Sequence, residues 1–130
     1  MTEKSTSDYQ WQGKKILIVE DDPVSSQLFN ILLRRRGPEL VCTDNGMKAV
    51  QICREDTGIS LVLMDIQLPV MDGYTATSKI KEIRAELPVI AQTAHCLEVD
   101  EQKCYEAGCD GYITKPVEST ELFRLIDRLI

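Results

Sequence analysis

Apolar and polar residues alternate along the chain in blocks that predict five repeats of a strand followed by a helix. Short apolar runs, each bounded by charged or turn-forming residues, are typical of buried strands. Between them, apolar residues recur at spacings of three and four, the period of a helix with one buried face. The predicted strands lie at about 15–20, 39–43, 61–65, 89–93 and 111–114, and the predicted helices begin at about 23, 46, 74, 97 and 119.

The ends and faces of these helices can also be predicted. Asp22 is expected to cap the first helix, with Pro23 at its first position, where a backbone amide would have no partner. The helix at about 97–107 has a thin apolar stripe for its length, which is typical of an element held loosely. The spacing assigns the following residues to the buried faces: Val24, Leu28, Ile31 and Leu32; Met47, Val50 and Cys53; Ala76, Ile80 and Ile83; Leu122, Leu125, Ile126 and Leu129.

The strand and helix repeats predict a parallel sheet joined by right-handed crossovers. The first and third strands are apolar throughout, as central strands covered on both faces should be, whereas the second is mixed and is typical of an edge. We therefore predict an α/β, flavodoxin-like doubly wound (βα)5 fold with a five-stranded sheet of order 2-1-3-4-5. Its switch point, where such folds bind ligands, lies between strands one and three.

Composition narrows the class of protein. The chain has 130 residues, 15 basic and 21 acidic, and its net charge of -6 speaks against non-specific binding of nucleic acid. No apolar run reaches the length of a membrane span, and five cysteines without a CxxC pair indicate buried thiols of a cytoplasmic protein. Residues 1–13 are polar and predict a flexible tail or linker, with Trp11 expected to fold back on a domain at 14–130.

Charged residues end three of the predicted strands. Glu20-Asp21-Asp22 follow the first strand, Asp65 ends the third, and Lys115 follows the fifth. Because the carboxyl ends of parallel strands share one edge, we expect these side chains to meet at the switch point. Three carboxylates packed together repel one another unless a cation intervenes. The all-oxygen set predicts Mg²⁺ that keeps several waters, with Mn²⁺ as a substitute.

These parts suit phosphoryl transfer to a carboxylate. Asp65 is the expected nucleophile, attacking phosphorus in line while the bound Mg²⁺ offsets the developing charge. Lys115 would supply a fixed positive charge, and Thr93, at the end of the fourth strand, a hydroxyl donor. The donor must be an activated phosphate, since the sequence lacks the P-loop that binds ATP.

From about residue 14 to the end, the chain resembles the receiver domain of two-component response regulators. The resemblance is carried by the acidic pair Glu20-Asp21 after an apolar strand, by the segment Leu63-Met64-Asp65 through Met71-Asp72-Gly73, and by Thr93 and Lys115-Pro116. Each match is weak alone, but the whole set in the correct order is specific.

The resemblance implies a role for each of these positions. Asp65 would be the phosphoacceptor, Thr93 and Tyr112 the switch residues, and the bond before Pro116 would be cis. Mg²⁺ would be held by Asp21, Asp65 and the backbone carbonyl of Gln67, with Glu20 acting through water. Gln67 and His95 would flank the water path to the acyl phosphate and set its lifetime.

The resemblance also implies partners. The phosphoryl group would come from a phosphohistidine on a histidine kinase or a histidine phosphotransfer protein. It would change the face made by helix four, strand five and helix five, which could also form a weak homodimer. Neither nucleic acid nor membrane is expected to contact this segment. A stand-alone regulator and the receiver of a hybrid histidine kinase are both open, and the loop Thr93-Ala94-His95 is more similar to the hybrid type.

Three other readings are less well supported. A Mg²⁺-dependent phosphohydrolase that forms an aspartyl phosphate would need a proton donor two residues after Asp65, where Gln67 stands. A flavin or nucleotide module would need a glycine-rich loop after the first strand, where Glu20-Asp21-Asp22 would repel a phosphate. A receiver that only docks would not need the complete set of Asp65, Thr93 and Lys115. We therefore expect a phosphoacceptor and not an enzyme.

Overall fold

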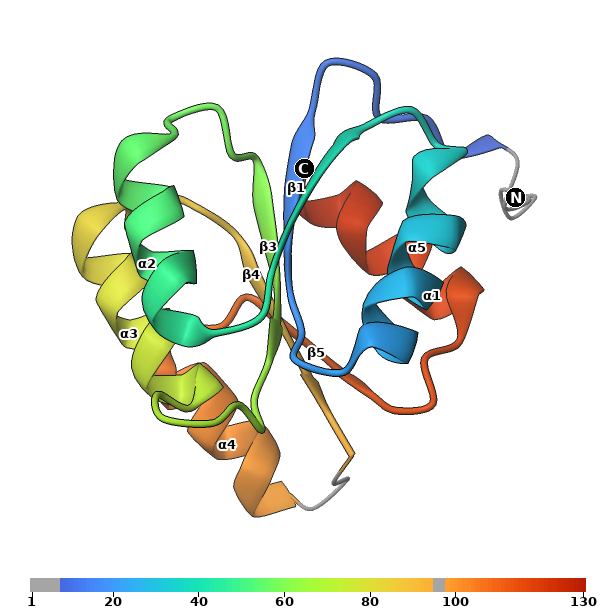
Figure 1. Ribbon diagram of the computed structural model, residues 1–130. Helices are drawn as coiled ribbons and strands as arrows, with labels where there is room; N and C mark the ends of the chain where they lie inside the picture. The colour runs from blue at the N-terminus through green and yellow to red at the C-terminus, as the bar shows by residue number, and fades with distance from the viewer. Residues whose placement is uncertain (1–7, 95–97) are drawn as a thin grey trace.

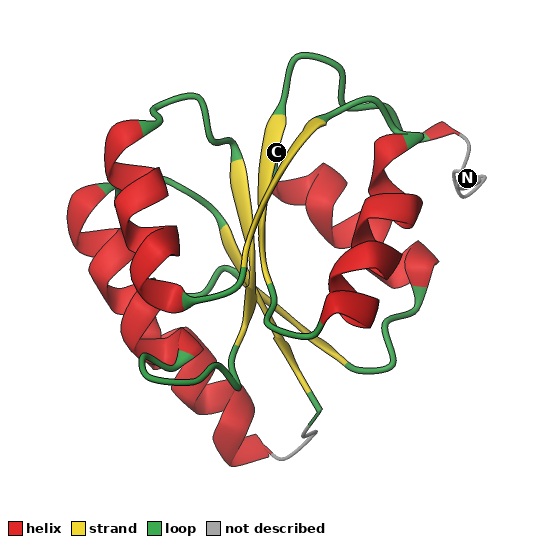
Figure 2. Ribbon diagram, in the orientation of Figure 1, coloured by secondary structure: helices red, strands yellow, loops and turns green. Residues whose placement is uncertain are grey.

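Five parallel strands form a central sheet with helices on both faces (Figures 1 and 2). The computed structural model describes residues 8–94 and 98–130. The strands are β1 (Lys15–Val19), β2 (Glu39–Thr43), β3 (Leu61–Asp65), β4 (Val89–Thr93) and β5 (Gly111–Thr114). The helices are α1 (Pro23–Arg34), α2 (Gly46–Glu55), α3 (Gly73–Ile83), α4 (Glu98–Ala107) and α5 (Ser119–Leu129).

The strand order is β2-β1-β3-β4-β5, with every neighbouring pair parallel. This confirms the predicted doubly wound, flavodoxin-like fold and the edge position of β2. All residues of β3 and β4 are buried, whereas β2 is only half-buried. The order reverses between β1 and β3, so the carboxyl ends of these two strands border the crevice where such folds bind ligands.

Two apolar cores lie on opposite faces of the sheet. Helices α2, α3 and α4 cover one face, and α1 and α5 cover the other (Figure 1). Successive residues of a strand point to opposite faces. In β3, for example, Val62 and Met64 belong to the α2–α4 core, whereas Leu61 and Leu63 belong to the α1/α5 core. This alternation fixes the direction of the side chains at the strand ends.

The predicted buried face of α1 is wrong for three of its four residues, and only Leu32 packs against the core as expected. Val24, Leu28 and Ile31 are exposed, and the helix instead buries Phe29 and Leu33 against β1 and α5. The sequence of α1 carries apolar residues on two sides, and the larger Phe29 fills the core while the second stripe faces outward. Met47 in α2 was also predicted to be buried and is 62% exposed. The faces predicted for α3 and α5 lie against the sheet as expected.

Residues before β1 pack on the α1/α5 face. Tyr9 and Trp11 are buried, and the Trp11 ring lies 5.7 Å from that of Phe123. The indole nitrogen of Trp11 donates to Asp127 Oδ1 at 3.0 Å, and its backbone amide donates to the carbonyl of Arg36. The division of the chain at residue 14 stays a prediction, but Trp11 does fold back on the domain.

Two further sequence observations can be compared with the structure. Among the described residues, no helix is both long and apolar enough to cross a membrane. Four cysteines within the described ranges are free thiols, and Cys53, Cys104 and Cys109 are buried. Burial raises the pKa of the Cys53 thiol to about 11, so this side chain behaves as an apolar group at neutral pH.

Candidate functional site

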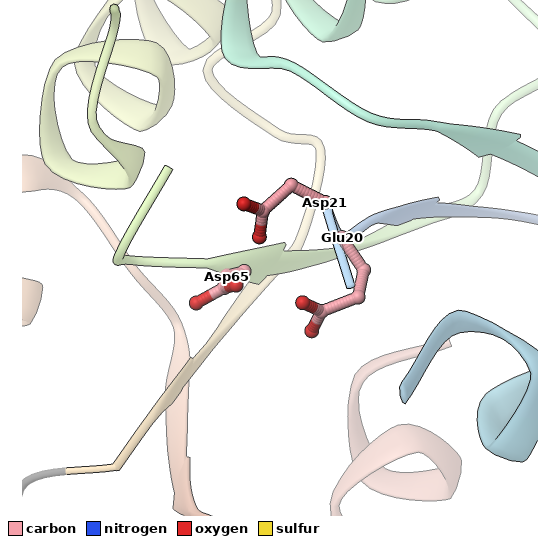
Figure 3. Close-up of side chains that lie close together, drawn as sticks. All are labelled: Glu20, Asp21 and Asp65. Carbon is pink, nitrogen blue, oxygen red and sulfur yellow. The ribbon is translucent and has the colours of Figure 1, made fainter. Parts of the chain in front are cut away.

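Three carboxylates converge where the sheet order reverses. Glu20 and Asp21 directly follow β1, and Asp65 is the last residue of β3. A carboxylate oxygen from each lies within 4.8 Å of one from the others (Figure 3). Glu20 and Asp65 are buried, whereas Asp21 is exposed at the mouth of the site. The predicted acidic cluster therefore forms, with two members at its floor and one at its rim.

Lys115 joins the cluster from β5. Its ammonium lies 3.0 Å from Glu20 Oε2 and 3.5 Å from Asp65 Oδ2. The bond between Lys115 and Pro116 is cis, the isomer that the resemblance implies. Because β4 lies between β3 and β5, the side chain of Lys115 must cross the end of β4 to reach both carboxylates. The site thus holds three acids and one base, an excess of negative charge.

This charge imbalance changes proton affinities. Burial and the nearby Asp65 raise the pKa of Glu20 to about 7, against the opposing effect of the Lys115 ammonium. Burial works against the charge of Lys115, but its hydrogen bond to Glu20 and the charge of Asp65 outweigh burial and raise the pKa of this lysine. The single positive charge of Lys115 is therefore too small to stabilise the ionised form of all three carboxylates.

Local backbone contacts position the acidic side chains. Asp22 caps α1 by accepting from the amide of Val24 at 3.1 Å, so it is engaged away from the cluster, as predicted. Asp65 Oδ1 accepts from the amide of Gln67 at 3.0 Å, which turns the loop after β3 back toward the site. That hydrogen bond places the backbone amide of Gln67 next to Asp65, and the carbonyl ligand expected at this position stays a prediction.

Gly73 lets α3 begin against the end of β3. A Cβ atom at this position would lie 2.3 Å from the carbonyl oxygen of Asp65 and 2.6 Å from the Cα of Ile66. The amide of Gly73 also donates to the carbonyl of Ile66 at 3.0 Å. A side chain here would push against backbone that cannot rotate away, so glycine is needed to hold Asp65 in place.

The predicted switch residues lie on the α2–α4 side of the sheet. Thr93 is buried at the end of β4, and Tyr112 on β5 is half-buried against the core of that face. They stand on adjacent, paired strands, and their switch role stays a prediction. His95, predicted to flank the water path, lies outside the described residues.

Gln92 is a polar residue of the site that was not singled out from the sequence. It is fully buried, and β4 places it directly beside Asp65 in the parallel register. Among the described residues, neither its amide oxygen nor its amide nitrogen has a hydrogen-bond partner. A single amide in an otherwise apolar strand was the available signal, but strand patterns alone do not say what such a residue faces.

The donor set fits a hard divalent cation. It consists of oxygen atoms from three side chains, close together and carrying more negative than positive charge. Mg²⁺ needs few protein ligands because it keeps several waters, and the exposed position of Asp21 leaves one side of the cluster open for them. The chemistry of Glu20, Asp21 and Asp65 therefore fits Mg²⁺.

Comparison with known proteins gives the same class as the fold and the site. The family model for the response regulator receiver domain matches residues 16–127, and the chain belongs to this family. It is therefore a receiver domain of two-component histidine kinase signalling. A receiver domain from a sensor histidine kinase of Pseudomonas aeruginosa, solved with magnesium in its active-site cleft, is 36% identical. That alignment has a TM-score of 0.83 and covers 90% of this chain and 97% of the other.

Other relatives differ in their architecture. The response regulator DivK of Brucella anthropi is 40% identical, over 80% of this chain and 85% of DivK. Histidine kinase 3 of Arabidopsis thaliana is 32% identical over 89% of this chain, but the chain spans only 13% of that kinase. A yeast receiver domain, Ssk1, solved in complex with the phosphotransfer protein Ypd1, is 29% identical with a TM-score of 0.84, over 92% of this chain and 90% of the other.

Proposed function

We propose that the chain is a phosphoacceptor that takes a phosphoryl group on Asp65 from a phosphohistidine of a partner protein. The observation that carries this proposal is the burial of Asp65 beside Glu20 and under the ammonium of Lys115. A buried carboxylate with one cation and two further acids is costly unless ligands balance its charge. A divalent cation and a phosphoryl group are the ligands that make use of every member of the site.

Each residue then has a defined task. Asp21, Asp65 and the backbone carbonyl of Gln67 would hold Mg²⁺, or Mn²⁺ in its place, with Glu20 acting through water. The bound ion would offset negative charge on the transferring oxygens. A carboxylate oxygen of Asp65 attacks phosphorus, and the bond to the donor nitrogen breaks. Lys115 stays charged beside the product and stabilises its oxygens.

The product would be read at the edge of the sheet formed by β5 and its neighbouring helices. In this proposal the hydroxyl of Thr93 moves toward the phosphoryl group, and Tyr112 then occupies the space beside it. The face formed by α4, β5 and α5 would change as a result. Among the described side chains of α4, only Cys104 is buried, so few apolar contacts oppose a shift of this helix. A weak homodimer through this face is compatible with the same change.

The phosphohistidine donor would dock on the rim of the site. Several large apolar side chains of α1, α2 and the loop after β3 are exposed, namely Val24, Leu28, Ile31, Met47 and Val70. Since a phosphohistidine must come within bonding distance of Asp65, its carrier has to cover this rim, and the complex of Ypd1 with a similar receiver domain supports such a carrier. Leu28→Glu should then slow transfer from a phosphohistidine protein but not from a small donor, whereas Tyr105→Glu on α4 should slow neither.

The wider setting follows from the same proposal. The chain would work in the cytoplasm, without contact to nucleic acid or membrane, as a phosphoacceptor and not as a turnover enzyme. The match to a small part of Histidine kinase 3 supports the receiver of a hybrid kinase. The match over most of DivK supports a stand-alone regulator instead, and both remain open.

The experiment is incubation with Mg²⁺ and acetyl phosphate, followed by intact mass spectrometry of the wild type and of Asp65→Asn. We expect the wild type to gain the mass of one phosphoryl group and the variant to gain none. EDTA should abolish the gain. A folded wild type that binds Mg²⁺ but gains no mass, and that releases no phosphate from acetyl phosphate, would exclude phosphoryl transfer and leave a docking module.

A further inference from the structure

Gln92 occupies a special place in the floor of the site. The register aligns Asp65 on β3 with Gln92 on β4, and Gln92 with Ile113 on β5. Glu20 follows Val19, which is paired with Met64, so it stands level with Asp65 on β1. The carboxyl edge of the sheet therefore carries a row of side chains in the order Glu20, Asp65, Gln92, Ile113.

The members of this row point to the same face. Residues two positions before them, Ile18, Leu63 and Ile90, all belong to the α1/α5 core, as does Ile113 itself. Side chains of a strand return to the same face every second residue, so Glu20, Asp65 and Gln92 lie on that face as well. Lys115 is two residues beyond Ile113 and shares this direction. The lysine side chain, crossing β4 to reach Asp65, thus passes over the position of Gln92.

The amide of Gln92 is in an unusual state. It is 0% exposed, yet neither of its polar atoms is hydrogen-bonded among the described residues. Buried amides are almost always paired, because an unpaired one loses its bonds to water without replacement. Sites that keep such a group at a cost to stability often use it in a second state of the protein.

We propose that Gln92 is a positioning residue for phosphoryl transfer, whose amide oxygen accepts a hydrogen bond from Lys115 when the carboxylates of the cluster are taken up by the cation and the phosphoryl group. The ammonium has three N–H donors and is now engaged with Glu20 and Asp65. A cation and a phosphoryl group bound to those carboxylates would weaken their interactions with the Lys115 ammonium. The amide of Gln92, the next polar group in the row, then keeps the ammonium over Asp65. This inference rests on the proposed phosphoacceptor function.

The test uses variants that remove the amide but keep the size of the side chain. Gln92→Met has nearly the same length, and Gln92→Leu serves as a second variant should methionine pack poorly. Thr77→Val is the matched control, because Thr77 is a fully buried polar residue of α3, which lies on the other face of the sheet. For each protein we would measure the rate of phosphorylation by acetyl phosphate, the affinity for Mg²⁺ by calorimetry, and unfolding in urea.

We expect Gln92→Met to be phosphorylated about ten-fold more slowly or worse, in the range that loss of one hydrogen bond to a charged group produces. Its Mg²⁺ affinity should stay within about two-fold of the wild type, since the amide binds no metal in this proposal. Its urea midpoint should be unchanged or higher, because a buried amide with no partner among the described residues has been replaced by an apolar group. Thr77→Val should keep the wild-type rate.

Two results would overturn the inference. One is a wild-type rate of phosphorylation in both Gln92 variants, which would make the amide an unused buried group. The other is a rate that falls only in proportion to Mg²⁺ affinity or to stability, which would make the role of Gln92 structural. A wild type that accepts no phosphoryl group at all would refute the proposed function itself, so the two failures can be told apart.

Discussion

At the level of single residues, the surroundings of Glu20 disfavour its ionised form. It is buried beside Asp65, and its pKa is raised to about 7 from an ordinary value of 4.5. Without metal, the carboxyl group of Glu20 therefore binds its proton more tightly in the folded protein than in the unfolded chain, and the difference matters between pH 4.5 and about pH 7. Linkage then requires the free energy of unfolding to fall as pH rises through this interval.

The corresponding prediction concerns Glu20→Gln. In EDTA, the unfolding free energy of the wild type should decrease from about pH 5 to about pH 8, and the variant should show a clearly smaller decrease. Urea unfolding followed by circular dichroism at several pH values measures both slopes. Asp22→Asn, at an exposed cap, is the control and should keep the wild-type slope. Equal slopes for wild type and Glu20→Gln would mean that Glu20 is not the group responsible.

Substitutions at the adjacent residues Asp21 and Asp22 should affect different properties, namely Mg²⁺ affinity and stability. Asp22→Ala removes the cap of α1 and should lower the free energy of unfolding by about 1 kcal/mol, with little effect on Mg²⁺ affinity. Asp21→Ala should do the reverse, lowering Mg²⁺ affinity by about ten-fold or more with little loss of stability. Calorimetric titration with Mg²⁺ and urea unfolding of both variants give the comparison. The assignment fails if Asp22→Ala weakens Mg²⁺ binding as much as Asp21→Ala.

At the scale of elements, the start of α3 controls the position of Asp65. In Gly73→Ala, the new Cβ would meet the Asp65 carbonyl oxygen at 2.3 Å, so the helix or the strand end must shift. We expect a loss of about 1–3 kcal/mol in unfolding free energy, the usual effect of overpacking, together with slower phosphorylation. Gly58→Ala is the control, because its Cβ would contact only side chains. Wild-type phosphorylation in Gly73→Ala would show that Asp65 tolerates movement of its neighbours.

Sequence patterns predicted some elements better than others for physical reasons. Strands β1 and β3 were predictable because central strands of a parallel sheet are apolar on both faces. The buried face of α1 was not, since Phe29 and Leu33 form one apolar stripe and Val24, Leu28 and Ile31 another. Periodicity finds both stripes but cannot say which one meets the sheet. The outward stripe belongs to the surface on which we propose that the phosphohistidine carrier docks.

In the site, too, some residues could be predicted from the sequence and another could not. Glu20, Asp65 and Lys115 could be predicted to meet because parallel strands bring their carboxyl ends to one edge. Gln92 was passed over, since only the register shows that it lies between Asp65 and β5. Among the described residues its amide has no hydrogen-bond partner. This depends on what surrounds it in three dimensions, and no local pattern contains that information.

At the scale of the whole molecule, the segment before β1 contributes to the folded domain. Trp11 is 3% exposed, contacts Phe123 of α5 and donates a hydrogen bond to Asp127. Trp11→Ala should therefore lower the free energy of unfolding by about 3–5 kcal/mol, the range for loss of a buried tryptophan. Gln12→Ala, at an exposed neighbouring position, should change it little. Urea unfolding followed by circular dichroism tests both, and a loss below about 1 kcal/mol for Trp11→Ala would contradict the packing.

The central claim is that Asp65 accepts the phosphoryl group, and locating that group in the chain tests it most directly. After reaction with acetyl phosphate and Mg²⁺, sodium borohydride would reduce an aspartyl phosphate to homoserine, which peptide mass spectrometry can place. The account predicts homoserine at position 65, dependent on Mg²⁺ and absent when EDTA is added. Homoserine at another aspartate, or a phosphoryl group on His95 with Asp65 unchanged, would contradict it.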